Sequence, residues 1–301
     1  MDTLIFTLNA VLPAFLIIAL GALAGKTMPG LDPLPIARLG TSFTTPALIL
    51  GTVAKAHISA SLALHVAVAY LTFLLVLGAV SYLLARQQSR PRRSGLMVTT
   101  LFANTGNMGL SLSLFAYGNA GLERSVIIFV LSMLLMFTVG PALLTGGGHF
   151  GRRLLDTWKW PPVWAAVGGI LLNVTHFQLP LFLDRVLTLL GSAAVPLMLM
   201  LLGIQVYRTW TWQLGSINWL SVALKSLLSP LLAASVGWLI GLRGLELAVL
   251  VLTGALPTAV NVFGVAVEAG GDHDDVGRTI FVTTLLSIFT IGATILLLHP
   301  T

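Results

Sequence analysis

Asn104, Thr105, Gly106 and Asn107 follow one another inside an otherwise apolar stretch, where Leu, Phe and Met are their neighbours. Glycine weakens a helix, and a buried amide costs free energy unless it finds a hydrogen-bonding partner. In an interrupted helix, asparagine side chains can donate to a ligand or bond the backbone groups that the interruption frees. The run therefore predicts a binding site for a small polar molecule at a broken helix.

A second run, which contains Pro257, Thr258 and Asn261, is similar to the first. The segments GLERSVIIFVLS and DVGRTIFVTTLLS, which follow the two runs, align with an offset of 154 residues, from position 124 to position 278. The same offset places Asn261 on Asn107. Because Pro257 lacks a backbone donor and frees a carbonyl, we expect this helix to break at the matching depth. Two such breaks would bring half-helix N-termini together, and these termini attract carboxylates.

A packing role is the alternative for both runs, because glycine and asparagine also join helices inside membranes. Another pair of similar segments favours duplication instead: LGTSFTTPALIL contains Pro46 and LGSAAVPLML contains Pro196. Interrupted helices at corresponding positions of two inverted halves are typical of transporter binding sites. We therefore include Pro46 among the candidate substrate-binding residues.

The composition places these runs in a membrane. Hydrophobic residues make up 56% of the chain, charged residues only 9%, and the mean hydropathy is +0.96. Soluble domains carry about 25% charged residues, and a membrane span needs about 20 apolar residues. Ten spans are predicted, at residues 3–24, 34–54, 60–85, 94–118, 123–145, 160–174, 184–207, 217–241, 245–269 and 276–298. The N-terminal segment has no basic region before its apolar residues, which favours a retained first helix over a cleaved signal peptide.

The basic residues predict the orientation of the chain. With both termini outside, four of the sixteen basic residues fall on the outer side and one, Lys225, lies within a span. The other eleven are on the inner side: Lys26, Arg38, Arg86, Arg90, Arg92, Arg93, Arg152, Arg153, Lys159, Arg208 and Arg278. This excess follows the positive-inside rule and indicates a topology signal rather than nucleic-acid binding. The ten spans then form two inverted halves, residues 1–150 and 151–301, with the fourth and ninth helices broken.

The sequence resembles the bacterial branch of the auxin efflux carrier family, which is related to plant PIN-type carriers. The resemblance rests on NTGNMGLSL, LPTAVNVFGVA and FTTPALIL, and it extends over essentially the whole chain. It implies a fold similar to bile-acid/sodium symporters and sodium/proton antiporters, with a scaffold of spans one, two, six and seven and a transport domain of spans three to five and eight to ten. It also implies transport of small organic anions such as dicarboxylates or indole carboxylates, a homodimer, and the inner membrane of the cell. Ser111 departs from the family pattern, where many members have proline.

Two charged residues near the predicted site have open roles. Lys225 lies within the eighth span and is a candidate anion attractor, since an intramembrane base is a functional hypothesis by default. It also lies six residues beyond Trp219, about 9 Å along a helix, so its side chain could instead extend to the interface. Glu268, near the end of the ninth span, is a weak candidate for coupling and a better candidate for an interfacial acid.

The sequence offers no covalent chemistry. It contains no cysteine, HExxH, GxSxG or phosphate loop, so we expect neither an enzyme nor a metal or other cofactor. The function expected is secondary transport of small organic anions, with alternating access around the broken helices. The alternatives are a sodium-coupled organic anion symporter of the bile-acid type, an anion channel, and a membrane sensor without transport.

Overall fold

The structure is a computed structural model that describes residues 2–56, 59–145, 160–208, 214–268 and 273–298. These residues are helical apart from short connections and one isolated bridge. In chain order the helices are α1 (Asp2–Thr27), α2 (Pro33–Leu39), α3 (Thr45–Ala54), α4 (Ala60–Ala85), α5 (Arg90–Leu101), α6 (Leu110–Thr145), α8 (Pro161–Val174), α9 (Leu181–Arg208), α10 (Ser216–Ala223), α11 (Ser229–Ile240), α12 (Gly244–Ala255), α13 (Asn261–Glu268) and α14 (His273–Leu297). Single π-helical turns, η1 (Gly40–Thr44), η2 (Thr105–Gly109) and η3 (Leu224–Leu228), precede α3, α6 and α11.

Six helical segments of the described chain are long and apolar enough to cross a membrane. They are Ile5–Thr27, Ser61–Ala85, Thr105–Thr145, Leu181–Arg208, Ser216–Ile240 and Asp275–Leu297. Two shorter apolar helices, α8 and α12, accompany them. The chain is therefore a polytopic all-helical membrane protein, as the sequence predicts. Helical residues also occur in each of the ten predicted ranges.

Gly118 interrupts the longest of these segments. Its φ of 64° and ψ of −159° are not helical, and they divide α6 into an arm before and an arm after this residue. Glycine adopts a positive φ without the steric penalty that a Cβ atom brings. The kink accounts for the two spans that the sequence predicts on either side of it, 94–118 and 123–145.

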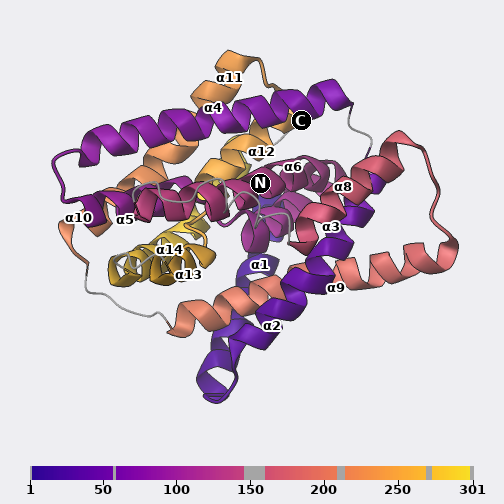
Figure 1. The fold of residues 1–301 in the computed structure, drawn as a ribbon, viewed down its shortest axis with the longest axis horizontal. Coiled ribbons are helices and arrows are strands. Elements are labelled where there is room, and N and C mark those ends of the chain that lie inside the picture. The colour runs from indigo at the N-terminus through magenta and orange to yellow at the C-terminus, as the bar shows by residue number, and fades with distance from the viewer. Residues whose placement is uncertain (1, 57–58, 146–159, 209–213, 269–272, 299–301) are drawn as a thin grey trace.

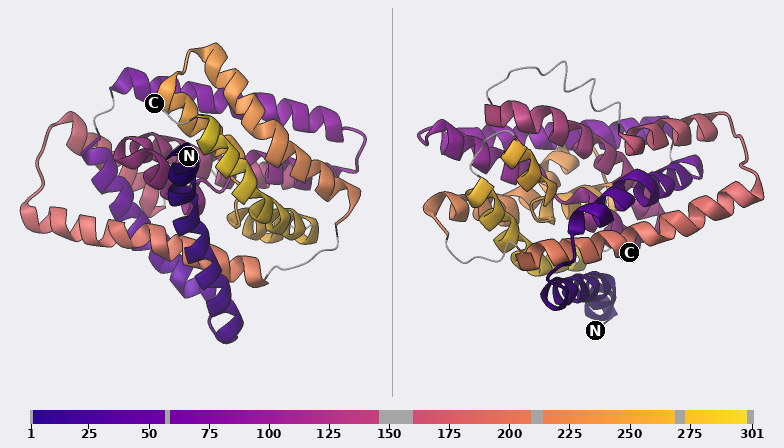
Figure 2. Two further views of the ribbon diagram at one scale, coloured as in Figure 1. Left: turned by 180° about the vertical axis from the view of Figure 1, so that it is seen from behind. Right: turned by 60° about the horizontal axis from the view of Figure 1, so that its bottom comes forward.

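The helices pack as two groups, one formed by α1, α2, α3, α8 and α9 and the other by α4–α6 and α10–α14. In the first group the backbones of α1 and α9 touch: a Cβ atom on Gly21 would lie 2.1 Å from the carbonyl O of Met200, and one on Gly203 would lie 2.0 Å from that of Ile18. Figure 1 shows α4 and α9 on opposite sides of the molecule, and Figure 2 shows α1 lying against α9. Most of the buried apolar side chains belong to one cluster that extends through both groups.

Candidate binding site

Two helices are interrupted, one between α5 and η2 and the other between α12 and α13, and the interruptions meet. An isolated antiparallel bridge pairs Ala103 with Thr258. The amide N–H of Asn104 donates to the carbonyl O of Pro257, with an N to O distance of 2.8 Å. Irregular backbone at membrane depth is tolerated only where its polar groups are bonded within the protein or face a cavity. Backbone groups of each interrupted segment are therefore hydrogen-bonded by the other segment.

The polar groups of Thr258 at the bridge bond to neighbouring helices. The Thr258 hydroxyl donates to the carbonyl O of Thr99 at the end of α5, at 2.6 Å. The Thr258 N–H in turn donates to the hydroxyl of Thr283 on α14, at 3.2 Å. Thr258 has no exposed surface, and both its N–H and its hydroxyl bond within the protein.

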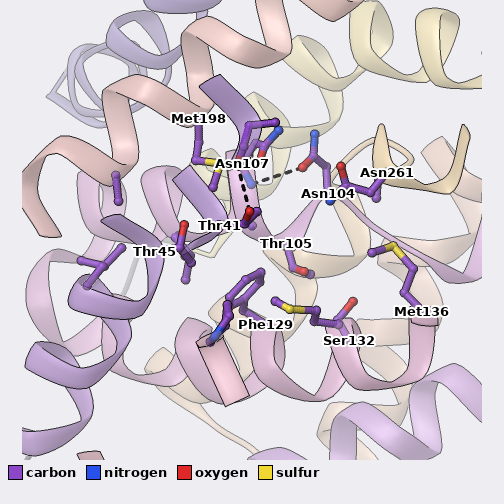
Figure 3. A pocket seen from close by; sticks show the side chains of 18 of the residues that line it. Thr41, Thr45, Asn104, Thr105, Asn107, Phe129, Ser132, Met136, Met198 and Asn261 are labelled. Atoms are coloured by element: carbon purple, nitrogen blue, oxygen red, sulfur yellow. Dashed lines mark hydrogen bonds between the residues drawn. The ribbon is translucent and has the colours of Figure 1, made fainter. Parts of the chain in front are cut away.

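A cavity of about 70 Å³ lies beside the bridge, between the two groups of helices. A buried water needs roughly 10–15 Å³ on this measure, so the cavity holds several waters or a small ligand. Figure 3 labels ten of its lining residues: Thr41, Thr45, Asn104, Thr105, Asn107, Phe129, Ser132, Met136, Met198 and Asn261. The lining combines η1, α3 and α9 of the first group with η2, α6 and α13 of the second.

Two buried polar atoms in this lining have no hydrogen-bonding partner: Nδ2 of Asn104 and Oγ1 of Thr45. The orientation of the Asn104 amide is fixed, because its Oδ1 accepts from the backbone N–H of Asn107 at 3.3 Å. A buried donor without a partner costs about 1–3 kcal/mol, and such groups are rare in folded proteins. Both atoms therefore mark the cavity as a place where a ligand or water supplies the missing bonds.

The electrostatics of the cavity come from the backbone. None of the described lining residues is charged. Two helical segments begin at the cavity, η2 at Thr105 and α13 at Asn261, and both first residues line it. A helix N-terminus carries about half a positive elementary charge. The N–H groups of Thr105, Asn107, Val262 and Phe263 already bond within the protein, so these two termini offer the cavity mainly that charge. The arrangement suits a small ligand that is negatively charged or rich in acceptors.

Glycine is required where η2 passes the ring of Phe129. A Cβ atom on Gly106 would lie 2.9 Å from Cε2 of that ring. A Cβ atom on Gly109, one turn later, would lie 3.0 Å from Cδ1 of Leu256 beside the other break. Ser111, which stands where proline is common in the resembling family, donates its hydroxyl to the carbonyl O of Asn107 at 2.8 Å.

The structure brings five of the ten predicted site residues to the cavity wall: Asn104, Thr105, Gly106, Asn107 and Asn261. Pro257 and Thr258 lie behind them in the bridge, and Pro46 is half-buried at the start of α3 beside the lining residue Thr45. Lys225 does not line the cavity. Glu268 ends α13, and its side chain lies outside the described residues.

Lys225 is buried in η3, with 1% of its surface exposed and no hydrogen-bonding partner for Nζ. The turn η3 packs against α5, α12 and α14. One helical turn before it, the hydroxyls of Ser221 and Thr99 bond at 2.9 Å. One turn after it, the hydroxyl of Ser229 donates to the carbonyl O of Gly254 at 2.8 Å. The side chain therefore lies inside the second group of helices and does not extend to an interface.

Sequence reasoning missed the half of the cavity wall that other helices provide. These residues include Thr41, Thr45, Phe129, Ser132, Trp160 and Met198. Each is a single polar or apolar residue in, or directly before, a helix of ordinary membrane composition. Only the position of Thr45 before Pro46 gave a signal.

A family model described as "Membrane transport protein" matches residues 6–149 and 152–295 of this chain. An "Uncharacterized transporter" of Methanothermobacter thermautotrophicus is 29% identical over 96% of this chain and 95% of its own length. A second uncharacterized transporter, from Methanocaldococcus jannaschii, is 29% identical over 72% of this chain and 73% of its own. A "Putative malonate transporter" of Rhizobium meliloti is 28% identical over 66% of this chain and 65% of its own.

Proposed function

The chain belongs to the membrane transport protein family, whose members are transporters and not enzymes, and from this premise we propose that it carries small organic anions through the cavity at the paired helix breaks. The observation that carries the proposal is the unpartnered Asn104 amide, which faces an uncharged cavity at the start of η2. An amide N–H₂ donates, and so does a helix N-terminus. A carboxylate accepts such bonds without a counter-ion.

The size of the cavity and the chemistry of its wall favour a small carboxylate. The wall of the cavity of about 70 Å³ combines polar side chains, among them Asn104, Thr45 and Asn261, with apolar ones that include Phe129 and Met136. A short dicarboxylate or a monocarboxylate with a small apolar body matches this mixed wall. The relative named as a malonate transporter supports the dicarboxylate.

Movement of the anion is proposed to follow alternating access. The cavity lies between the two helix groups, so displacement of one group along the other would change the face to which it opens. In this proposal α1, α2, α3, α8 and α9 are the scaffold, and the remaining helices form the transport domain. The chain would cross the inner membrane ten times as two inverted halves, with both termini external and two copies in a homodimer. Lys225 does not line the cavity, so in this proposal it would attract the anion only through the electric field of its charge.

Reconstitution into liposomes tests this function. Purified protein is incorporated, and uptake of labelled malonate, small monocarboxylates and matched amines is measured with and without sodium and proton gradients. We expect saturable uptake of carboxylates only. Thr45→Val, which removes the unpartnered hydroxyl without changing its shape, should reduce uptake several-fold.

Thr138→Val is the matched control for that variant. Thr138 is also buried, but its hydroxyl bonds within α6 to the carbonyl O of Leu134, at 2.7 Å, and it does not line the cavity. Uptake by this variant should equal that of the unchanged protein. Equal uptake by both variants, or uptake of amines in place of carboxylates, would contradict the proposal.

A further inference from the structure

A second, larger cavity of about 460 Å³ lies at the Lys55 end of α3. We call it the vestibule; its lining includes Gly51, Thr52, Asn119 and Gly191. The side chain of Leu48 lines both this vestibule and the binding cavity. We propose that Leu48, together with Leu110 and Leu114, is the barrier that closes the binding cavity toward the vestibule. The inference rests on the proposed function, because it makes the vestibule the access route for the transported anion.

Each of three helices passes from one cavity to the other within about one turn. On α3, Thr45 lines the binding cavity, Ala47 lines the vestibule, and Leu48 lines both. The other two helices change in the same way, α6 from Leu110 to Leu114 and α9 from Ala194 to Gly191. The two spaces are thus separated by a single layer of side chains.

Leucine side chains fill that layer. Leu110 is 3% exposed and belongs to a buried apolar cluster, and the half-buried Leu48 and Leu114 pack against the same cluster. An apolar plug of this kind excludes water and ions, since neither finds a hydrogen-bonding partner there. The layer is thin enough that removal of one leucine should open it.

The barrier is divided between the two helix groups. Leu48 is held to α9 by close backbone contact, because a Cβ atom on Gly191 would lie 3.1 Å from the Cα atom of Leu48. Leu110 and Leu114 belong instead to α6, in the second group. A displacement of α6 along α3 and α9 would therefore separate the leucines and connect the two cavities. The barrier opens by the same motion that alternating access requires.

The vestibule wall carries one basic and one acidic side chain, Lys55 and Glu123, so it has no net charge that would trap an anion. Lys55 lies 2.5 Å from the carboxylate of Asp184. Arg124 lies 3.9 Å from the carboxylate of Glu123 and bonds that of Glu246 at 2.9 Å. Thr52 and Asn119 leave the wall polar. A hydrated anion can enter such a space and leave it again.

The barrier can be tested with cysteines, because the chain contains none. Thr52→Cys reports the face of the membrane to which the vestibule opens. Ala194→Cys places a reporter in the binding cavity, one turn behind the barrier. With a membrane-impermeant thiol reagent added on the vestibule face, Ala194→Cys should react slowly. Combined with Leu48→Ala, the same reporter should react at least about tenfold faster, because the substitution removes the side chain that fills the layer.

Leu50→Ala is the matched control. Leu50 is a half-buried leucine of the same helix that packs near Gly168 of α8 and lines neither cavity. It should leave the labelling rate of the reporter unchanged. Leu114→Ala opens the same layer from α6 and should act like Leu48→Ala, which keeps the test decisive if one variant does not fold. Labelling that stays at background in both barrier variants, or that rises equally in Leu50→Ala, would overturn the proposal.

The labelling needs no substrate, so its result is separable from that of the transport assay. Faster labelling without carboxylate flux would support the barrier and contradict the proposed substrate. Carboxylate flux with unchanged labelling would support the transport function and contradict the barrier.

Discussion

The backbone N–H of Asn104 bonds the carbonyl O of Pro257 at 2.8 Å and so joins the two interrupted helices. Because proline has no N–H, Pro257 brings no backbone donor that would need a partner at the interruption. Asn104 contributes its backbone to the bridge and its side-chain oxygen to the N–H of Asn107. Its Nδ2 atom is then left without a partner at the cavity. One residue therefore stabilises the break and, in the proposed function, would present a donor to the ligand.

Asn261→Ala should separate binding from stability. Asn261 begins α13, is exposed, and lines the cavity. An exposed side chain contributes little to folding, and surface substitutions usually change stability by less than about 0.5 kcal/mol. We expect a marked loss of carboxylate uptake with an unchanged melting temperature. Normal uptake would show that α13 does not reach the ligand.

Gly106→Ala should impair transport by steric contact. The added methyl group would lie 2.9 Å from Cε2 of Phe129, which lines the cavity, so the ring must shift. Uptake should fall, and a second substitution, Phe129→Leu, should restore part of it, because the pair would then couple. Gly264→Ala is the control, since a Cβ atom there meets nothing within 4 Å. An equal loss in both glycine variants would point to helix flexibility instead of contact with Phe129.

The sequence predicted the breaks but not their surroundings, for a physical reason. The run from Asn104 to Asn107 conflicts with its own apolar neighbours, and such a local conflict is visible without a structure. The span 60–85 was predicted with the bounds of α4, because an uninterrupted apolar helix is decided by local composition. The pairing of Ala103 with Thr258, in contrast, depends on long-range packing. The contribution of Met198 to the cavity wall depends on it as well. The inverted repeat, the ten crossings and the homodimer stay predictions.

Lys225 is a residue whose role the sequence left open between an anion attractor and a side chain that extends to the interface. The sequence allowed its side chain to extend to the interface, whereas the structure buries Nζ without a partner. The composition of the span does not show whether the Lys225 side chain is buried. The groups that pack around it, such as the hydroxyls of Thr99 and Ser221 one turn before η3, come together only in the fold.

Lys225→Met should therefore raise stability and lower transport. Methionine is close to lysine in length and has no charge to bury, so removal of the unpartnered group should add about 1–3 kcal/mol to the free energy of unfolding. Transport should fall if the lysine attracts the anion, because functional groups are often retained at the expense of stability. Melting curves and uptake rates measure the two effects. A less stable variant with normal transport would contradict both expectations.

The uneven distribution of basic residues predicts the orientation of the chain, and single cysteines test it directly. Arg90→Cys should react with an impermeant reagent only from the cytoplasmic side, and Lys55→Cys only from outside, because the positive-inside rule places the base-rich loops in the cytoplasm. Both positions are exposed. Reaction of Arg90→Cys from outside would invert the proposed topology, although the fold would be unaffected.

The sign of the ligand's charge is the strictest test of the site. Two helix starts and the Asn104 amide point to a cavity whose described wall contains no charged side chain, so a cation would enter without a counter-ion. Small carboxylates should stabilise the purified protein, and matched amines should not. At a hundredfold excess over the dissociation constant, one bound ligand adds about 2.7 kcal/mol, which a melting curve detects. Asn104→Asp keeps the shape of the side chain and replaces its donor with a negative charge, so stabilisation by carboxylates should disappear. The carboxylate can still accept from the N–H of Asn107, so the break itself should persist. If carboxylates stabilise Asn104→Asp as they do the unchanged protein, the anion binds elsewhere; if amines stabilise the unchanged protein, the helix N-termini do not determine what the cavity accepts.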